Sequence, residues 1–253
     1  MIDSEFLTQY QPRENLLQNK VVAVTGAGDG IGKATSLAFA KHGATVILIG
    51  RTLAKLEQVY DAIENASCPK PAIYPMNFEG AEEKSFHEMR DVFVKEFGQL
   101  DGILHNASQL GKRTPISDYP LTEWHKILHV NLTAPFIMTK TLLPLLQKSS
   151  GASVVFTSSS VGKQGKAYWG AYAVSKAATE NLVQVMADEL DGTSKIRVNA
   201  INPGATRTRM RAAAYPAEDP STVVNPESIV NRYLFLMGDD SELINGQQFD
   251  AQP

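Results

Sequence analysis

Tyr172 and Lys176 lie four residues apart in the segment Tyr-Ala-Val-Ser-Lys. On an α-helix this spacing brings both side chains to the same face. A free tyrosine has a pKa of about 10, too high for easy proton exchange at neutral pH, and a nearby ammonium group lowers it. The pair therefore predicts a proton-transfer site in which Tyr172 acts as general acid in a reduction and as general base in an oxidation.

Ser159 precedes Tyr172 by thirteen residues and directly follows an apolar run at 153–156. Because parallel sheets bind ligands at the carboxyl ends of their strands, this position favours a functional hydroxyl. Ser158 and Ser160 leave the assignment open by one residue, with Ser159 preferred. A Tyr–Lys pair alone is also compatible with a solvated helix face. Tyr168 has a tyrosine rather than a lysine four residues later, and we interpret it, with Trp169, as a pocket wall.

A glycine-rich turn occupies residues 25–32, between an apolar run at 21–24 and a helical pattern that extends to about His42. Glycines allow the backbone to turn sharply and to lie close to a pyrophosphate, which the following helix N-terminus attracts. A tight turn without a ligand is the alternative. The strand–turn–helix context favours dinucleotide binding, in which Gly26, Asp29, Gly30, Ile31 and Gly32 would take part.

The next apolar run ends at Gly50-Arg51. An acidic residue at this strand end would bond the ribose 2′-hydroxyl and select NAD, but glycine stands there. The guanidinium of Arg51 could instead pair with a 2′-phosphate. This favours NADP, with NAD still possible, over the alternative of a solvated arginine at a helix start.

Strands and helices alternate along most of the chain, which predicts a mostly parallel sheet with right-handed crossovers. We therefore expect an α/β fold: one doubly wound Rossmann-type domain, with about seven strands flanked by helices, over residues 20–253. Residues 1–19 have no clear period and are expected to form an arm or cap. Strands are expected at 21–24, 45–49, 72–76, 100–104, 153–156, 196–201 and 247–250, and helices at 53–65, 81–97, 121–146, 170–190 and 227–237.

Composition excludes several classes of protein. The 253 residues carry a net charge of −3, which does not indicate a nucleic-acid partner. The single cysteine, Cys68, excludes an intrachain disulfide framework and a multi-cysteine metal site. No apolar stretch approaches the ~20 residues of a membrane span, and the N-terminus lacks a secretory signal pattern. We expect a cytoplasmic protein that does not bind membranes.

The predicted helix at 170–190 carries apolar side chains at nearly every angle. Such a helix is buried on most sides, whereas the sheet covers only one of them. A second copy of the chain would cover the other side. We therefore expect a homodimer or a homotetramer.

The pattern T-G-x-x-x-G-x-G, formed with Gly26, Gly30 and Gly32, resembles that of the short-chain dehydrogenases/reductases, and the resemblance extends from about Lys20 to Asp250. It implies hydride transfer between a nicotinamide cofactor and a small carbonyl or alcohol, without a metal. Tyr172 and Lys176 would match the family's Y-x-x-x-K motif, the lysine also bonding the nicotinamide ribose. Ser159 would bond the substrate oxygen, and Asn131 would hold a water in the proton relay.

The resemblance also implies further contacts with the cofactor. Residues 105–108 resemble the family's N-N-A-G, with histidine and serine at the outer positions and with Asn106 and Ala107 beside the cofactor. Asn77 stands where relatives place an aspartate that bonds the adenine. Asp29 departs from the basic residue of many NADP-preferring relatives. The nicotinamide carboxamide would be held by the loop that contains Pro203, Gly204, Thr206 and Thr208.

A substrate lid is expected at about 205–225. Its three arginines, Arg207, Arg209 and Arg211, are compatible with an acidic substrate, although solvated side chains are the preferred interpretation. The runs 156–165 and 249–253 resemble the bacterial YciK-type oxidoreductases within the family. Two alternatives stay open: a 3-oxoacyl-thioester reductase of fatty-acid synthesis, and a non-catalytic dinucleotide-binding sensor or scaffold.

Overall fold

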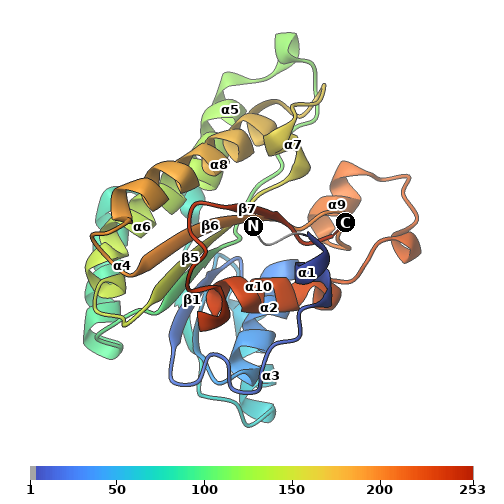
Figure 1. The fold of residues 1–253 in the computed structure, drawn as a ribbon. Coiled ribbons are helices and arrows are strands. Elements are labelled where there is room, and N and C mark those ends of the chain that lie inside the picture. Colours follow the sequence, from blue (N-terminus) through green and yellow to red (C-terminus); the bar gives the residue numbers. More distant parts are fainter. Residues whose placement is uncertain (1–3, 253) are drawn as a thin grey trace.

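The computed structural model describes residues 4–252, and its centre is a seven-stranded, wholly parallel sheet with the strand order β3-β2-β1-β4-β5-β6-β7 (Figure 1). This confirms the predicted doubly wound α/β fold. The order reverses direction between β1 and β4, the position at which such sheets bind ligands. The strands are β1 (Val21–Thr25), β2 (Thr45–Gly50), β3 (Ala72–Pro75), β4 (Gly102–His105), β5 (Ala152–Thr157), β6 (Ile196–Asn202) and β7 (Gln248–Asp250).

Helices cover both faces of the sheet because successive side chains of each strand point to opposite sides. In β1, Val22 and Val24 pack into one apolar core and Ala23 into the other. Figure 1 shows the two helical layers. The first core is closed by α1 (Ser4–Gln9), α2 (Gly30–Lys41), α3 (Leu53–Asn65) and α10 (Val230–Met237), and the second by α4 (Glu83–Glu96), α6 (Ala134–Leu146) and α8 (Gly170–Leu190), with α5 (Leu121–Leu128) beside α8.

The N-terminal residues pack closely against the rest of the fold. Leu7, Leu16 and Leu17 are buried in the first core. The hydroxyl of Tyr10 donates to Asp240 at 2.6 Å. The described part of the predicted arm thus contributes to the same core as α10.

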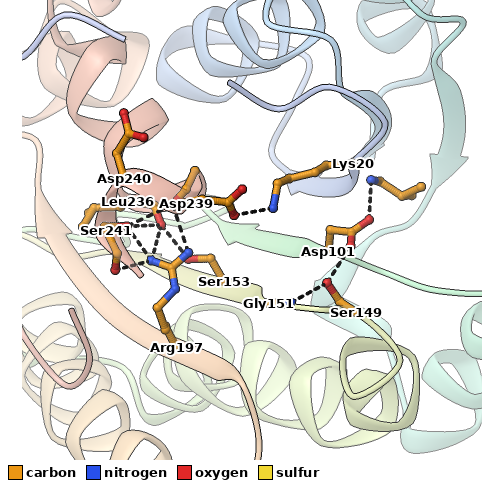
Figure 2. A network of polar contacts seen from close by, with 12 residues as sticks. Lys20, Asp101, Ser149, Gly151, Ser153, Arg197, Leu236, Asp239, Asp240 and Ser241 are labelled. Carbon is orange, nitrogen blue, oxygen red and sulfur yellow. Dashed lines mark hydrogen bonds and ion pairs between the residues drawn. The ribbon is translucent and has the colours of Figure 1, made fainter. Parts of the chain in front are cut away.

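A buried polar network fixes the C-terminal end of α10 at the amino edge of the sheet (Figure 2). The guanidinium of Arg197, in β6, donates to the carbonyls of Gly238 at 3.0 Å and Ser241 at 2.7 Å. The Ser153 hydroxyl, in β5, donates to the Leu236 carbonyl at 2.6 Å. These donors satisfy carbonyls that a helix end leaves unpaired, and the cation complements the helix dipole. The network rigidifies the edge opposite the expected site.

Three expected segments differ in detail from the structure. The helix expected at 121–146 is divided into α5, a π-helix (His129–Thr133) and α6, which begins with Pro135 in its first turn. The segment at 205–225, for which no helix is predicted, contains α9 (Arg209–Ala214) and a short 3-10 helix (Pro220–Thr222). The helix expected at 227–237 begins as a 3-10 turn (Pro226–Ile229) before α10, as its proline at the first position favours.

Candidate active site

One cavity of about 970 Å³ opens at the carboxyl edge of the sheet. Its lining combines the glycine turn, the ends of β2, β4, β5 and β6, and part of α8 and α9. Gly32 and Asn131 are not part of this lining. Gly32 packs against Gly26 and Asn106, and Asn131 bonds Gln109, which lines the cavity. The predicted site residues that line the cavity are Gly26, Asp29, Gly30, Ile31, Arg51, Asn77, Asn106, Ala107, Ser159, Tyr172, Lys176, Pro203, Gly204, Thr206 and Thr208.

Three of the four predicted catalytic side chains meet on one wall of the cavity. Tyr172 and Lys176 are both buried on α8, as their spacing predicts, and the Lys176 ammonium lies 5.6 Å from the centre of the Tyr172 ring. Ser159 follows β5 and shares a hydrogen bond with the Tyr172 phenol. The Lys176 Nζ donates to the Thr157 carbonyl at 2.7 Å. A phenol, a hydroxyl and an ammonium group therefore face one space.

Burial shifts the pKa values of the two ionisable groups on this wall. It raises the pKa of Tyr172 to about 12, and the hydrogen bond with Ser159 opposes that rise. The expectation that Lys176 lowers this pKa is not met, because burial of the phenol dominates. Burial also lowers the pKa of Lys176 to about 8, and the charge of Glu180 opposes this. At neutral pH the phenol is protonated, the form that can donate a proton to a carbonyl oxygen.

The three consecutive serines have different environments. Ser158 is buried, and its hydroxyl donates to the carboxylate of Glu180 at 2.5 Å. Ser160 begins the short helix α7 (Ser160–Lys163), with Ser159 at its N-cap. Only Ser159 has a hydrogen bond with Tyr172. These contacts distinguish Ser159 from Ser158 and Ser160, which the sequence pattern left as alternatives.

Asn131 lies in the π-helix and is buried. Its amide group donates to the Gln109 carbonyl at 2.9 Å and to the Ser175 hydroxyl at 3.0 Å, and its oxygen accepts from the Gln109 N–H at 2.8 Å. Ser175 stands between Tyr172 and Lys176 on α8 and donates to the Tyr172 carbonyl. Asn131 thus connects α8 to the loop after β4. A π-turn at such a position is frequent at functional sites.

The glycine turn brings backbone very close to backbone. Gly26 has a φ of +70°, which side chains rarely adopt. A Cβ on Gly32 would lie 2.2 Å from the Gly26 carbonyl oxygen and 2.7 Å from the Asn106 amide nitrogen. Asp29 caps α2 by accepting from the Gly30 N–H at 2.9 Å. The exposed N-terminus of α2 and the absence of side chains at the turn fit a bound pyrophosphate.

The charge of Asp29 is neutralised by its neighbours. The Lys55 ammonium lies 2.5 Å from its carboxylate, and the Arg209 guanidinium lies 3.4 Å away. Lys55 is one turn into α3, and Arg51 precedes that helix; both line the cavity. The end of β2 is therefore cationic, although Asp29 departs from the pattern of NADP-preferring relatives.

The residues after β4 are fixed to β1. The N–H groups of Asn106 and Ala107 both donate to the Thr25 hydroxyl, at 2.9 and 3.0 Å. Asn77 also lines the cavity, but its side-chain oxygen already accepts from the Glu79 N–H at 3.2 Å. That bond uses one of the two lone pairs of the amide oxygen, and the other can still accept from an adenine amino group.

The loop at residues 203–206 is held by the chain's C-terminal segment. The Gln252 amide donates to the carbonyls of Pro203, at 2.7 Å, and Ala205, at 3.0 Å. The Thr206 hydroxyl donates to the Pro203 carbonyl at 3.1 Å. Thr208 caps α9 by accepting from the Arg211 N–H at 3.1 Å, and its methyl group lies against Gly30. The lid helix therefore reaches the glycine turn.

The expectation of an aromatic pocket wall is half right. Trp169 is buried and lines the cavity, with its ring 5.7 Å from that of Tyr172. Tyr168, whose φ is +73°, is 55% exposed and is not part of the lining. His105 is buried beneath the site on Phe156 and bonds Thr139, in keeping with a structural role.

Several residues of the site escaped sequence reasoning. Lys55 could have been found from its position four residues after Arg51 on a predicted helix. Thr25 is signalled only by its place at a strand end. Glu180 has no such signal, because a buried carboxylate cannot be told from an exposed one by its position on an apolar helix. Gln252 depends on a contact between distant segments.

Residues 4–252 lack two further classes of site. No group of His, Cys, Asp and Glu side chains there is arranged to hold a metal ion. None of the helices in that range combines the length and the apolar character that a bilayer crossing requires.

Comparison with known proteins agrees with this geometry. Residues 20–219 match the family model described as short chain dehydrogenase. The uncharacterized oxidoreductase YciK of Escherichia coli K12 is 46% identical over 244 residues, which cover 96% of each chain. A short chain dehydrogenase structure from Pseudomonas syringae is 51% identical, with a TM-score of 0.95, and the match covers 96% of this chain and 99% of that one.

A second solved structure, a short chain dehydrogenase from Escherichia coli CFT073 complexed with NADPH, is 46% identical with a TM-score of 0.93, covering 96% of this chain and all of that one. The family match extends over most of this chain, and the YciK match over nearly all of it. The expected subgroup resemblance is thereby confirmed. The chain belongs to the short-chain dehydrogenase family.

Proposed function

We propose that this protein is an NADP(H)-dependent oxidoreductase that interconverts a small carbonyl compound and its alcohol. The observation that carries the proposal is the meeting of Tyr172, Ser159 and Lys176 on one wall of a cavity whose opposite part is the glycine turn. A protein that only bound a dinucleotide would have no need of a buried phenol there. NADPH bound in this cavity supplies the hydride for the carbonyl carbon.

In the reductive direction the chain's own groups act on the carbonyl oxygen. Ser159 donates a hydrogen bond to it, and Tyr172 donates its proton as the carbonyl carbon accepts the hydride. The carbonyl becomes an alcohol, and NADPH becomes NADP⁺. The Lys176 ammonium lies 5.6 Å from the centre of the Tyr172 ring, beside the phenolate that remains, but burial still raises the pKa of Tyr172. Asn131 positions α8 through its hydrogen bond with Ser175. We also propose that Asn131 holds a water in the proton relay.

The experiment that tests this function is a screen for NADPH consumption with ketones, aldehydes, quinones and acyl thioesters. Turnover of at least one carbonyl class supports the proposal. Tight NADPH binding without turnover of any class would favour a sensor or scaffold. A strong preference for acetoacetyl thioesters would favour the fatty-acid reductase instead. We place the reaction in the cytoplasm, as the composition predicts.

Arg51 is proposed to contact the 2′-phosphate of NADP, with Lys55 beside it. We expect Arg51→Ala to weaken NADPH binding by about tenfold, since charge-assisted hydrogen bonds contribute about 1.5–3 kcal/mol and this side chain is exposed. NADH, which has no such phosphate, should bind the variant as it binds the wild type. Fluorescence titration of both cofactors measures the ratio. Equal losses for the two would remove this assignment.

The outer face of α6 and α8 is proposed to pair with a second copy of the chain. It presents Phe136, Val174 and Val185, each 42–45% exposed. A shallow apolar hollow lies between these helices, lined in part by Leu132 and Leu182. Burial of such a face in a dimer removes apolar surface from water.

Sedimentation velocity at micromolar concentration should therefore show a dimer or tetramer. We expect Val185→Glu to shift the protein toward monomer, because a charge in the paired face loses its hydration. The control is Leu243→Glu, since Leu243 is 89% exposed outside this face. A wild-type protein that sediments as a stable monomer would contradict the pairing.

A further inference from the structure

The wall around Tyr172 belongs to an apolar cluster that is separate from the two main cores. Its buried members include Trp169, Tyr172, Val161 and Ala214, and Tyr215 packs against them. These five residues line the cavity. The Trp169 ring centre lies 5.7 Å from that of Tyr172 and 6.0 Å from that of Tyr215. The space beside the proton donor is therefore bounded by flat aromatic surfaces.

Arg113 holds the two outer rings of this cluster in place. Its guanidinium lies 4.7 Å from the centre of the Trp169 ring and 5.4 Å from that of Tyr215. It also donates to the Ala214 carbonyl at the end of the lid helix α9. Arg113 itself is not part of the cavity lining. Because a cation stacked on both rings stabilises their orientation from outside, the aromatic walls are preformed.

The arginines of the lid are bound within the protein. Arg211 forms a two-fold contact with Glu218, at 2.7 and 2.5 Å, and stacks on Tyr215 at 3.8 Å. Arg209 pairs with Asp29 across the cavity, and Arg207 donates to Asn225. The acidic substrate that these arginines suggested would have to break such contacts. We therefore prefer the interpretation that the three lid arginines do not bind the substrate.

Two lysines line the cavity close to this cluster. Lys126 pairs with Glu123 at 2.7 Å. Lys166, three residues before Trp169, is exposed and forms no ion pair with another residue in the range 4–252. Because Arg113 and Lys166 are cations beside the cluster, the flat aromatic surfaces, and not charge, define the substrate type.

We propose, on the basis of the carbonyl chemistry proposed above, that the substrate is a compound whose carbonyl or alcohol group is attached to a flat apolar ring. The ring lies against Trp169 and Tyr215, and the oxygen lies at Tyr172 and Ser159. Small aliphatic carbonyls leave the aromatic walls uncovered. The pocket therefore selects for a flat ring.

The test measures binding without reaction. Acetophenone and butanone are each titrated calorimetrically into the enzyme saturated with NADP⁺, which cannot reduce them. We expect acetophenone to bind at least about tenfold more tightly than butanone, since one buried aromatic contact changes affinity by about that factor. Trp169→Ala should weaken acetophenone binding about tenfold and leave NADP⁺ binding unchanged.

The matched control is Tyr168→Ala, which removes the neighbouring exposed ring and should leave acetophenone binding unchanged. Trp169→Leu keeps the position apolar if the alanine variant fails to fold, and it should also weaken acetophenone. Equal affinities for acetophenone and butanone would overturn the proposal. Because the complexes are unreactive, these results are independent of turnover, whose absence in the NADPH screen contradicts the proposed function instead.

Discussion

Tyr172→Phe is expected to lower the rate of carbonyl reduction by at least about a hundredfold, the lower end of what general acid catalysis contributes. The substitution removes one oxygen atom and keeps the ring that packs against Trp169. The proton donor is lost, while the shape of the cavity is retained. Steady-state NADPH consumption measures the loss of turnover, and fluorescence titration should show NADPH affinity within about twofold of wild type.

Tyr168→Phe is the control for this substitution. Tyr168 is an exposed tyrosine four residues earlier, outside the cavity lining, and its hydroxyl has no part in the proposed chemistry. The control variant should retain full activity. Retained activity in Tyr172→Phe would remove the proton-donor role. Equal loss of activity in both variants would indicate that the substitutions act through the local structure around residues 168–172.

Gly32→Ala is expected to weaken cofactor binding by at least about tenfold, because overpacking at a rigid contact costs about 1–3 kcal/mol. The added Cβ would lie 2.2 Å from the Gly26 carbonyl oxygen. That neighbour is backbone rather than the end of a flexible side chain, so the turn itself must move. Isothermal titration with NADPH measures the affinity, and circular dichroism verifies that the variant is folded.

The control for this prediction is Gly80→Ala. Gly80 has no heavy atom within 4 Å of the position where its Cβ would lie, and its φ is not positive. It should bind NADPH as the wild type does. Wild-type affinity in Gly32→Ala would show that the close contact between Gly26 and Gly32 is not needed for cofactor binding.

Local patterns in the sequence predicted much of the fold and of the site. Each strand is a short apolar run because helices cover both faces of the sheet. Consecutive apolar residues such as 21–24 therefore predict a buried strand. The spacing of Tyr172 and Lys176 is likewise a local property of one helix. The glycine turn is recognisable because only glycine permits the approach seen at Gly32.

What the sequence could not supply depends on contacts between distant segments. The π-turn around Asn131 has no signature in residue type, since it is stabilised by bonds to Gln109 and Ser175. The pKa of Tyr172 is set by burial and by Ser159, and proximity to Lys176 along the helix predicted the opposite direction. The partners of the lid arginines also required tertiary structure, because Asp29 lies far from Arg209 in the chain.

In the proposed function, hydride and proton reach one carbonyl group in this cavity. The direct measurement uses NADPH that carries deuterium at the transferable C4 position, with a ketone that the screen identifies as a substrate, and locates the label by mass spectrometry and NMR. We predict deuterium on the carbinol carbon of the alcohol with the wild type, and at least about a hundredfold less labelled product with Tyr172→Phe. NADPH oxidation without deuterium in the alcohol, or equal labelling by the two proteins, would contradict it.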